Sequence, residues 1–221
     1  MTILLAPFLF VLALRADEKF FSFSKDNIRR AFLFGLPLLV AVVVYLIYNF
    51  VRFDAPMETG YIYIAKPDLG HASLINDRLL AHGLFSKDYV LFNFFHLFIQ
   101  GFHLEWGGRE LLTPLGLDPM GTSLLAASPF VMLAVFAPLR RDVVIGGFCA
   151  AVIIGITLLY HGNGFSQYNA QRFVLDWAPV LFYVLALALT KTMRPALAVL
   201  TTYGIGLNVV AMAVLALLHQ A

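Results

Sequence analysis

Two charged residues, Arg172 and Asp176, stand four positions apart at the start of a strongly apolar segment. Residues with this spacing meet on one face of an α-helix, so we expect the two side chains to pair. Ionisable groups near lipid are costly and often mark a functional site. One interpretation is a phosphate clamp, in which Arg172 binds an anionic lipid head group and Asp176 orients the guanidinium. The other is an interfacial anchor that fixes the rotation of the helix.

Further polar residues precede this pair and extend the candidate binding site. Gln167 and Tyr168 lie in the same short loop and supply hydrogen-bonding groups. His161 lies at the end of the preceding apolar segment and is a further candidate. We therefore expect Gln167, Tyr168 and His161 to contribute to binding of the lipid phosphate.

Two carboxylates, Asp54 and Glu58, follow another apolar segment. A carboxylate there is a weak candidate for a general base or for a metal ligand. Pro56 lies between the two residues and argues against a helix that would place them on one face. The alternative interpretation is a solvated turn.

Two histidines, His96 and His103, are seven residues apart. A zinc site needs at least three protein ligands with second-shell support. Glu105 and Glu110 are near in sequence, but they complete no recognised ligand spacing. We therefore predict interfacial histidines rather than a metal site.

The composition indicates a membrane protein. The chain has 221 residues, of which 61% are hydrophobic and 13% are charged. The charged fraction is about half of that in a soluble domain. The mean hydropathy is +0.83. The net charge of +2 is too small to indicate nucleic acid as a partner. The single cysteine, Cys149, lies in an apolar run and cannot form an internal disulfide.

A membrane-spanning helix needs about 20 mostly apolar residues. On this basis we predict an all-α polytopic bundle that forms a single transmembrane domain over residues 1–221. The apolar run 3–14 is too short to span and is interpreted as part of a helix. The five predicted full spans are 31–51, 122–139, 143–160, 173–190 and 195–218.

The distribution of basic residues predicts the orientation of these spans. The connections 15–30, 139–142 and 191–194 carry nine Lys and Arg residues in short loops, so they are expected to be cytoplasmic. The loops 52–121 and 161–172 then face outside together.

An amphipathic helix is predicted within the long outer loop, over residues 88–104. Asn93, His96, Gln100 and His103 recur at spacings of three, four and three, which places them on one helical face. Phe, Leu and Ile occupy the rest of the surface. We expect this helix to lie at the outer membrane interface.

Several runs resemble bacterial polytopic glycosyltransferases of the GT-C superfamily. The run LIYNFVRFDAPMETGY (46–61) is similar to their "YN..RFG.P.ETGY" pattern. GLFSKDYVLFNFF (83–95) and GTSLLAASPF (121–130) resemble stretches that follow it there. GFSQYNAQRFVLDWAPVLF (164–182) resembles their "QFGYRF.LD..P" element, with Arg172, Asp176 and Pro179 matching, although Asn169-Ala170 replaces the usual Gly-Tyr.

The resemblance implies a protein-mannosyltransferase-like enzyme that moves a sugar from a polyprenyl-phosphate donor at the outer face of a bacterial inner membrane. It places the catalytic acidic residue in a first outer loop that this sequence does not contain. The chain is therefore expected to be the lipid-donor-binding C-terminal half of such an enzyme. Its partners would be membrane lipid, the polyprenyl-linked sugar and the missing half or a partner subunit. A divalent cation stays open as a cofactor.

Two other functions stay open on the sequence. An O-antigen-ligase-like transferase would use His96, His103 and Arg109. A membrane scaffold or truncated gene product would perform no chemistry. A transporter is disfavoured, because the predicted spans carry almost no charge at mid-depth.

Overall fold

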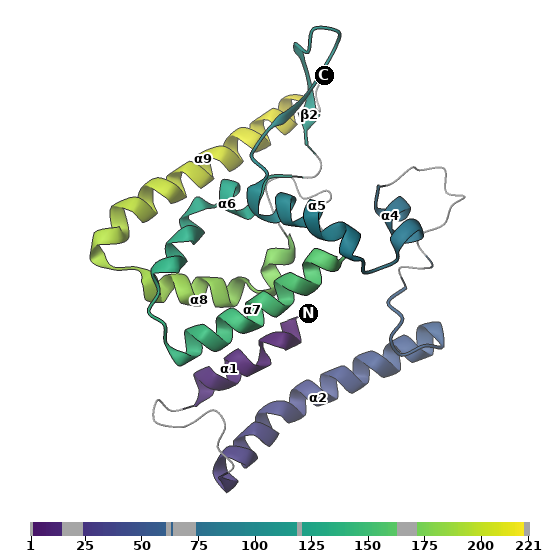
Figure 1. Cartoon of the computed structure of the whole chain (residues 1–221), viewed down its shortest axis with the longest axis vertical. Coiled ribbons are helices and arrows are strands. Elements are labelled where there is room, and N and C mark those ends of the chain that lie inside the picture. Colours follow the sequence, from purple (N-terminus) through teal and green to yellow (C-terminus); the bar gives the residue numbers. More distant parts are fainter. Residues whose placement is uncertain are drawn as a thin grey trace. The chain divides into compact units, whose positions relative to one another are not determined.

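The computed structural model describes residues 2–14, 24–60, 63, 74–118, 121–162 and 172–218, and these are mostly helical (Figure 1). The chain divides into two compact units, Met1–Leu84 and Phe85–Ala221, and each is described by itself. The single transmembrane domain expected over residues 1–221 stays a prediction.

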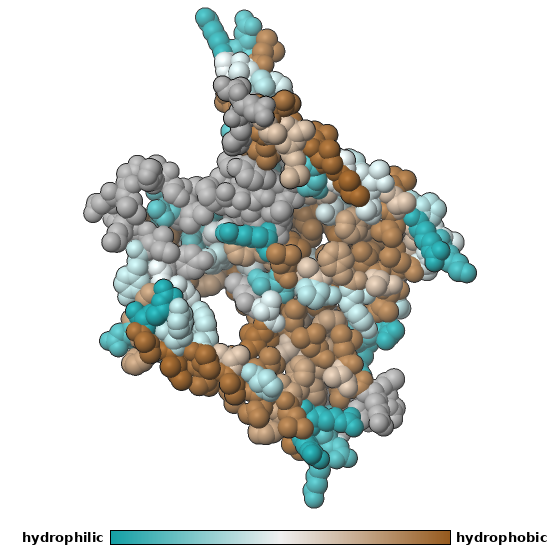
Figure 2. Space-filling view, turned by 180° about the vertical axis from the view of Figure 1, so that it is seen from behind, coloured by the Kyte–Doolittle hydropathy of each residue, from teal (hydrophilic) through white to brown (hydrophobic). Residues whose placement is uncertain are grey.

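Three helices are long and apolar enough to cross a membrane. They are α2 (Lys25–Phe53), α7 (Arg141–Leu159) and the stretch Lys191–Leu217, which consists of η7 (Lys191–Met193) and most of α9 (Arg194–Leu218). At 1.5 Å per residue, even the shortest is about 28 Å long, close to the thickness of the hydrocarbon core. Figure 2 shows hydrophobic surface along α2, with hydrophilic side chains at both ends. These helices indicate a membrane protein.

The prediction of five full spans is wrong, because two of the segments are broken helices. Segment 122–139 forms α6 (Leu124–Ala127) and the 3₁₀ helix η5 (Pro129–Phe136). Ser128 separates them with φ −140° and ψ 62°. The proline that follows lacks an N–H and cannot continue the α-helical hydrogen bonds.

Segment 173–190 is interrupted in the same way. It forms the 3₁₀ helix η6 (Arg172–Asp176) and α8 (Ala178–Ala188), with Trp177 between them at φ −124° and ψ −1°. Alone, α8 is about 16 Å long, which is too short to span. The 3₁₀ helix η5 of the other broken segment packs against α8 and α9. The irregular backbone of η5 therefore lies against protein. Irregular backbone at membrane depth is tolerated under that condition.

The described residues of the first unit also form three short helices. The 3₁₀ helix η1 (Thr2–Leu5) and α1 (Ala6–Ala13) form the short apolar helix predicted over residues 3–14. The helix α4 (Leu74–His82) follows the long α2. The Ser24 hydroxyl caps the start of α2 by accepting from the Asn27 N–H at 3.2 Å.

The helix predicted over residues 88–104 is shorter than expected. It comprises η3 (Lys87–Tyr89), α5 (Val90–Phe94) and the π-helix η4 (Phe95–Ile99), and it ends before Gln100. Its buried face carries Tyr89, Asn93 and Leu97.

This helix has apolar side chains on its exposed face and one polar side chain, Asn93, on its buried face. We name the exposed apolar residues of its other face the apolar stripe; they are Leu91, Phe94, Phe95 and Ile99. A polar side chain turned inward and an apolar stripe turned outward are typical of a helix in contact with lipid.

A β-hairpin begins where the end of the helix was predicted. The strands β1 (Leu104–Gly107) and β2 (Thr113–Leu117) are antiparallel, with Leu104 opposite Leu117 and an irregularity between Glu105 and Trp106. The strand β2 packs against α9, which fixes the base of the hairpin to the bundle.

The last carbonyls of α7 accept hydrogen bonds from the segment that begins at Phe85. The Asn93 side-chain amide donates to the Leu158 carbonyl at 2.8 Å and to the Tyr160 carbonyl at 2.9 Å. The Ser86 N–H donates to the Leu159 carbonyl at 2.9 Å. Helix ends leave such carbonyls without intrahelical partners. Residues 86–93 therefore cap α7.

The first turn of α7 is joined to α8 by a polar cluster. The guanidinium of Arg140 donates to both carboxylate oxygens of Asp142, at 3.2 and 3.0 Å. The hydroxyl of Tyr183 donates to the same carboxylate. Since Asp142 is buried, the cluster compensates a carboxylate that would be costly without partners.

Replacing Asn93 with alanine should destabilise the second unit, because the buried Tyr160 carbonyl and the partly buried Leu158 carbonyl lose their donor. We expect the free energy of unfolding to fall by about 1–3 kcal/mol. An SDS titration in mixed micelles, followed by circular dichroism, measures this change. Asn208→Ala is the matched control, since Asn208 donates only to the Gly204 carbonyl within its own helix. If the free energy of unfolding falls equally in the two variants, capping of α7 by Asn93 contributes no more to stability than a hydrogen bond within one helix.

Candidate functional site

The end of α7 at Leu159 carries a group of contacting aromatic rings that we name the aromatic platform. The ring of Tyr160 lies 5.7 Å from that of Phe85 and 5.5 Å from that of Phe173, measured between centroids. These three residues come from the start of the capping segment, the end of α7 and the start of η6. The platform therefore joins three segments that are distant in the sequence.

Arg172 lies on this platform. Its guanidinium carbon is 5.1 Å from the centroid of the Phe173 ring, and its side chain is exposed. Such stacking restricts the plane of a guanidinium. The buried ring of His161 lies 4.5 Å from that of Tyr160. Two predicted site residues, Arg172 and His161, thus each contact a different ring of the platform.

Asp176 does not join Arg172. Both residues are described, and no ion pair connects them. The expected pairing assumed an α-helix, whereas the backbone here is the 3₁₀ helix η6. With three residues per turn, positions four apart point about 120° away from one another. Gln167 and Tyr168, the other predicted site residues, lie outside the described residues.

The candidate carboxylates Asp54 and Glu58 lie in the turn after α2, in the first unit. The carboxylate oxygen Oε1 of Glu58 accepts from the N–H groups of Thr59 and Gly60, at 2.9 and 2.7 Å. This oxygen therefore stabilises the turn. Asp54 is exposed and has a left-handed backbone, with φ 55°. Of the two carboxylates, only Asp54 lines an open hollow beside the end of α2.

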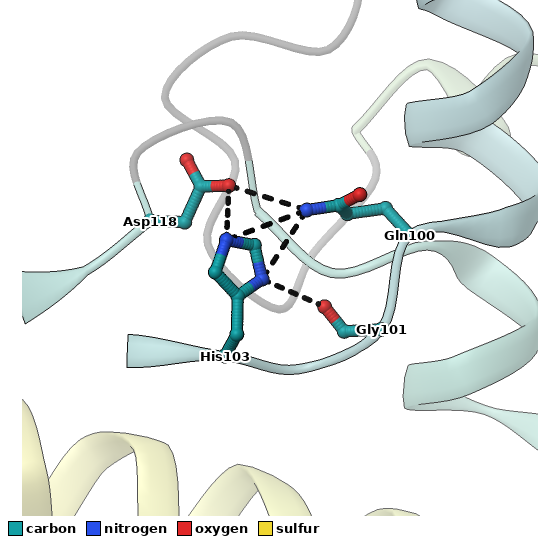
Figure 3. Close-up of polar contacts among 4 residues, drawn as sticks. All are labelled: Gln100, Gly101, His103 and Asp118. Carbon is teal, nitrogen blue, oxygen red and sulfur yellow. Dashed lines mark hydrogen bonds and ion pairs between the residues drawn. The ribbon is translucent and has the colours of Figure 1, made fainter. Parts of the chain in front are cut away.

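A polar cluster that the sequence did not predict holds the base of the hairpin (Figure 3). His103 Nε2 lies 2.9 Å from Asp118 Oδ2, and His103 Nδ1 lies 3.1 Å from the Gly101 carbonyl. The amide nitrogen of Gln100 lies 3.4 Å from the same Asp118 oxygen. Figure 3 shows the imidazole between the carboxylate and the carbonyl.

The three residues of the O-antigen-ligase-like interpretation lie in different elements. His96 is in η4, where its ring stacks on Phe92 at 3.9 Å and its Nδ1 contacts the Phe92 carbonyl at 2.9 Å. His103 precedes β1, and Arg109 is exposed in the turn of the hairpin. Within the described residues, no hydrogen bond or ion pair joins any two of His96, His103 and Arg109. Nor does that part of the chain contain a group of three or more metal-ligating side chains.

The sequence interpretation missed the residues that position the site. The sequence places Asn93 on the polar face of an interfacial helix, yet its side chain is buried and caps α7. The aromatic platform carries no local signal, because its rings meet only after folding. No protein family, curated protein or solved structure matches this chain.

Removing the charge of Asp118 should loosen the hairpin. The side chain of His103 is 45% exposed and that of Asp118 is 14% exposed, so the ion pair contributes no more than about 1 kcal/mol. We therefore expect Asp118→Asn to accelerate amide hydrogen exchange in Leu104–Gly107 by up to about fivefold. The control is Glu105→Gln, which neutralises an exposed carboxylate on β1, the strand whose exchange is measured. Unchanged exchange in Asp118→Asn would contradict a role for the pair.

Proposed function

We propose that this chain is the lipid-donor-binding part of a membrane-embedded glycosyltransferase that uses a polyprenyl-phosphate sugar at the outer membrane face. The observation that carries the proposal is the exposed guanidinium of Arg172 on the aromatic platform, in the same unit as the apolar stripe. Together they match an amphiphile with an anionic head and a long hydrocarbon tail.

The head-group part of the proposal rests on Arg172. A planar guanidinium can donate two parallel hydrogen bonds to a phosphate, and such charge-assisted bonds are stronger than neutral ones. The Phe173 ring holds the guanidinium in a defined plane, so less side-chain entropy is lost on binding. The side chain also follows the apolar end of α7, at the depth where lipid phosphates are found if α7 crosses the bilayer.

The tail part of the proposal rests on the apolar stripe. Asn93 lies on the opposite face of the same helix and donates to the Tyr160 carbonyl, so it connects this helix to the platform. A polyprenyl chain lying along Leu91, Phe94 and Ile99 would bury apolar side chains that are exposed in this unit. The phosphate would then be placed towards Arg172.

An O-antigen-ligase-like transferase is the second candidate function. The observation that favours it is the pair His103–Asp118, in which a carboxylate orients an imidazole. Such a pair suits proton transfer, provided that one ring nitrogen can reach a substrate. In that case Arg109, and not Arg172, would contact the lipid phosphate.

Binding of a polyprenyl phosphate to the full chain in nanodiscs tests the proposal. Arg172→Ala should weaken the affinity for the phosphate by about tenfold to a hundredfold, because charge-assisted hydrogen bonds contribute about 1.5–3 kcal/mol. Arg172→Lys should retain part of the affinity, since it keeps the charge but loses the planar fork. Dissociation constants can be obtained by native mass spectrometry or thermophoresis.

Two controls make the result specific. The matching polyprenol, which has no phosphate, should bind the wild type and Arg172→Ala equally. Arg194→Ala, at the start of α9, removes an exposed arginine from the same unit and should leave binding unchanged. If Arg172→Ala binds as tightly as Arg194→Ala, the proposal is wrong. If affinity is lost instead in Arg109→Ala, the O-antigen-ligase-like function is favoured.

A further inference from the structure

A second arginine site lies in the first unit, at the end of α2. An open hollow of about 610 Å³ is lined by six residues, namely Phe50, Val51, Arg52, Phe53, Asp54 and Tyr63. All of them belong to the last turns of α2 or to the segment that follows it. The hollow therefore combines aromatic rings with one cation and one anion.

Arg52 is held in place by aromatic side chains. Its guanidinium donates to the Tyr48 hydroxyl at 3.3 Å. The guanidinium carbon lies 5.1 Å from the centroid of the Tyr48 ring and 4.7 Å from that of the Phe53 ring. None of the ion pairs among the described residues includes Arg52. The guanidinium is therefore oriented by rings, and its charge is not neutralised by a paired carboxylate.

The Phe53 ring that supports Arg52 is itself fixed. It stacks on Tyr63 with a centroid distance of 5.5 Å and an interplanar angle of 11°. Gly60, with φ +86°, lies against the tip of the Phe53 ring. A Cβ atom at Gly60 would come within 2.8 Å of the Cζ atom of Phe53. The amide of Asn49 donates to the Pro56 carbonyl at 3.3 Å and holds the turn against the helix. The hollow is thus part of a defined local structure.

Asp54 makes the hollow zwitterionic. Its N–H donates to the Phe50 carbonyl at 2.8 Å, and its left-handed backbone places it directly after the last helical residue. A helix C-terminus carries partial negative charge, which disfavours a ligand that is only an anion. A ligand that carries a cation beside its anion satisfies both Arg52 and Asp54.

We propose that this hollow binds the head group of a zwitterionic phospholipid of the phosphoethanolamine class. Arg52 binds the phosphate, and Asp54 binds the ammonium group. The rings of Phe53 and Tyr63 add cation–π attraction for the ammonium. The acyl chains lie along the exposed apolar surface of α2, which includes Ile47 and Val51. This proposal needs neither a sugar donor nor Arg172 and is independent of the proposed function.

Lipid retention tests the site directly. The full chain is purified from vesicles that contain equal amounts of phosphatidylethanolamine and phosphatidylglycerol, and bound lipid is counted by native mass spectrometry. Arg52→Ala should retain about tenfold less phosphatidylethanolamine than the wild type, because the phosphate loses its charged donor. Arg29→Ala is the matched control, since it removes an exposed arginine from the other end of the same helix.

Asp54→Asn distinguishes this site from a plain phosphate site. It should abolish the preference for phosphatidylethanolamine over phosphatidylglycerol while total lipid retention is kept. Soluble phosphoethanolamine should displace the lipid at lower concentration than inorganic phosphate does. The proposal is overturned if Arg52→Ala and Arg29→Ala retain the same lipid. It is also overturned if Asp54→Asn keeps the preference or if inorganic phosphate competes equally well, because the site would then recognise phosphate alone.

Discussion

The capping of α7 is the interaction on which the second unit depends. Water does not reach the last carbonyls of a helix where they are buried under protein, and each buried carbonyl without a donor costs free energy. Here Ser86 and Asn93 supply the donors for Leu158, Leu159 and Tyr160. The same bonds fix the segment from Phe85 to Asn93 across the helix end. The aromatic platform and the apolar stripe therefore take their places because the backbone of α7 must be satisfied.

The same constraint operates at the other helix ends, with different residues. At the end of α2, the Asp54 N–H bonds to the Phe50 carbonyl and Asn49 holds the turn that follows. At the start of α7, Arg140 and Tyr183 surround the carboxylate of Asp142. Polar residues in this chain thus gather where helices end.

The sequence predicts those helices that are recognised by a long, continuous run of apolar residues. The helices α2, α7 and α9 follow from apolar length alone. Segments 122–139 and 173–190 fail because hydropathy does not report backbone continuity, which Pro129 and Trp177 interrupt. Periodicity correctly predicts a helix up to Ile99, but it assigns Asn93 to the wrong surroundings. A period shows which residues share a face, and it does not show whether that face meets water, lipid or another helix.

The two arginine sites differ in how far the sequence can reveal them. Around Arg52, every contact described joins residues at most 10 positions apart, so the run 46–61 holds most of the parts in fixed spacing. The residues that resemble the glycosyltransferase pattern there, including Asn49, Phe53 and Gly60, are the residues that contact one another. Around Arg172, the rings come from positions 85, 160 and 173, and no short pattern can encode that meeting. A short run of sequence therefore holds the contacts around Arg52, whereas the contacts around Arg172 require the fold, because the capping of α7 brings their parts together.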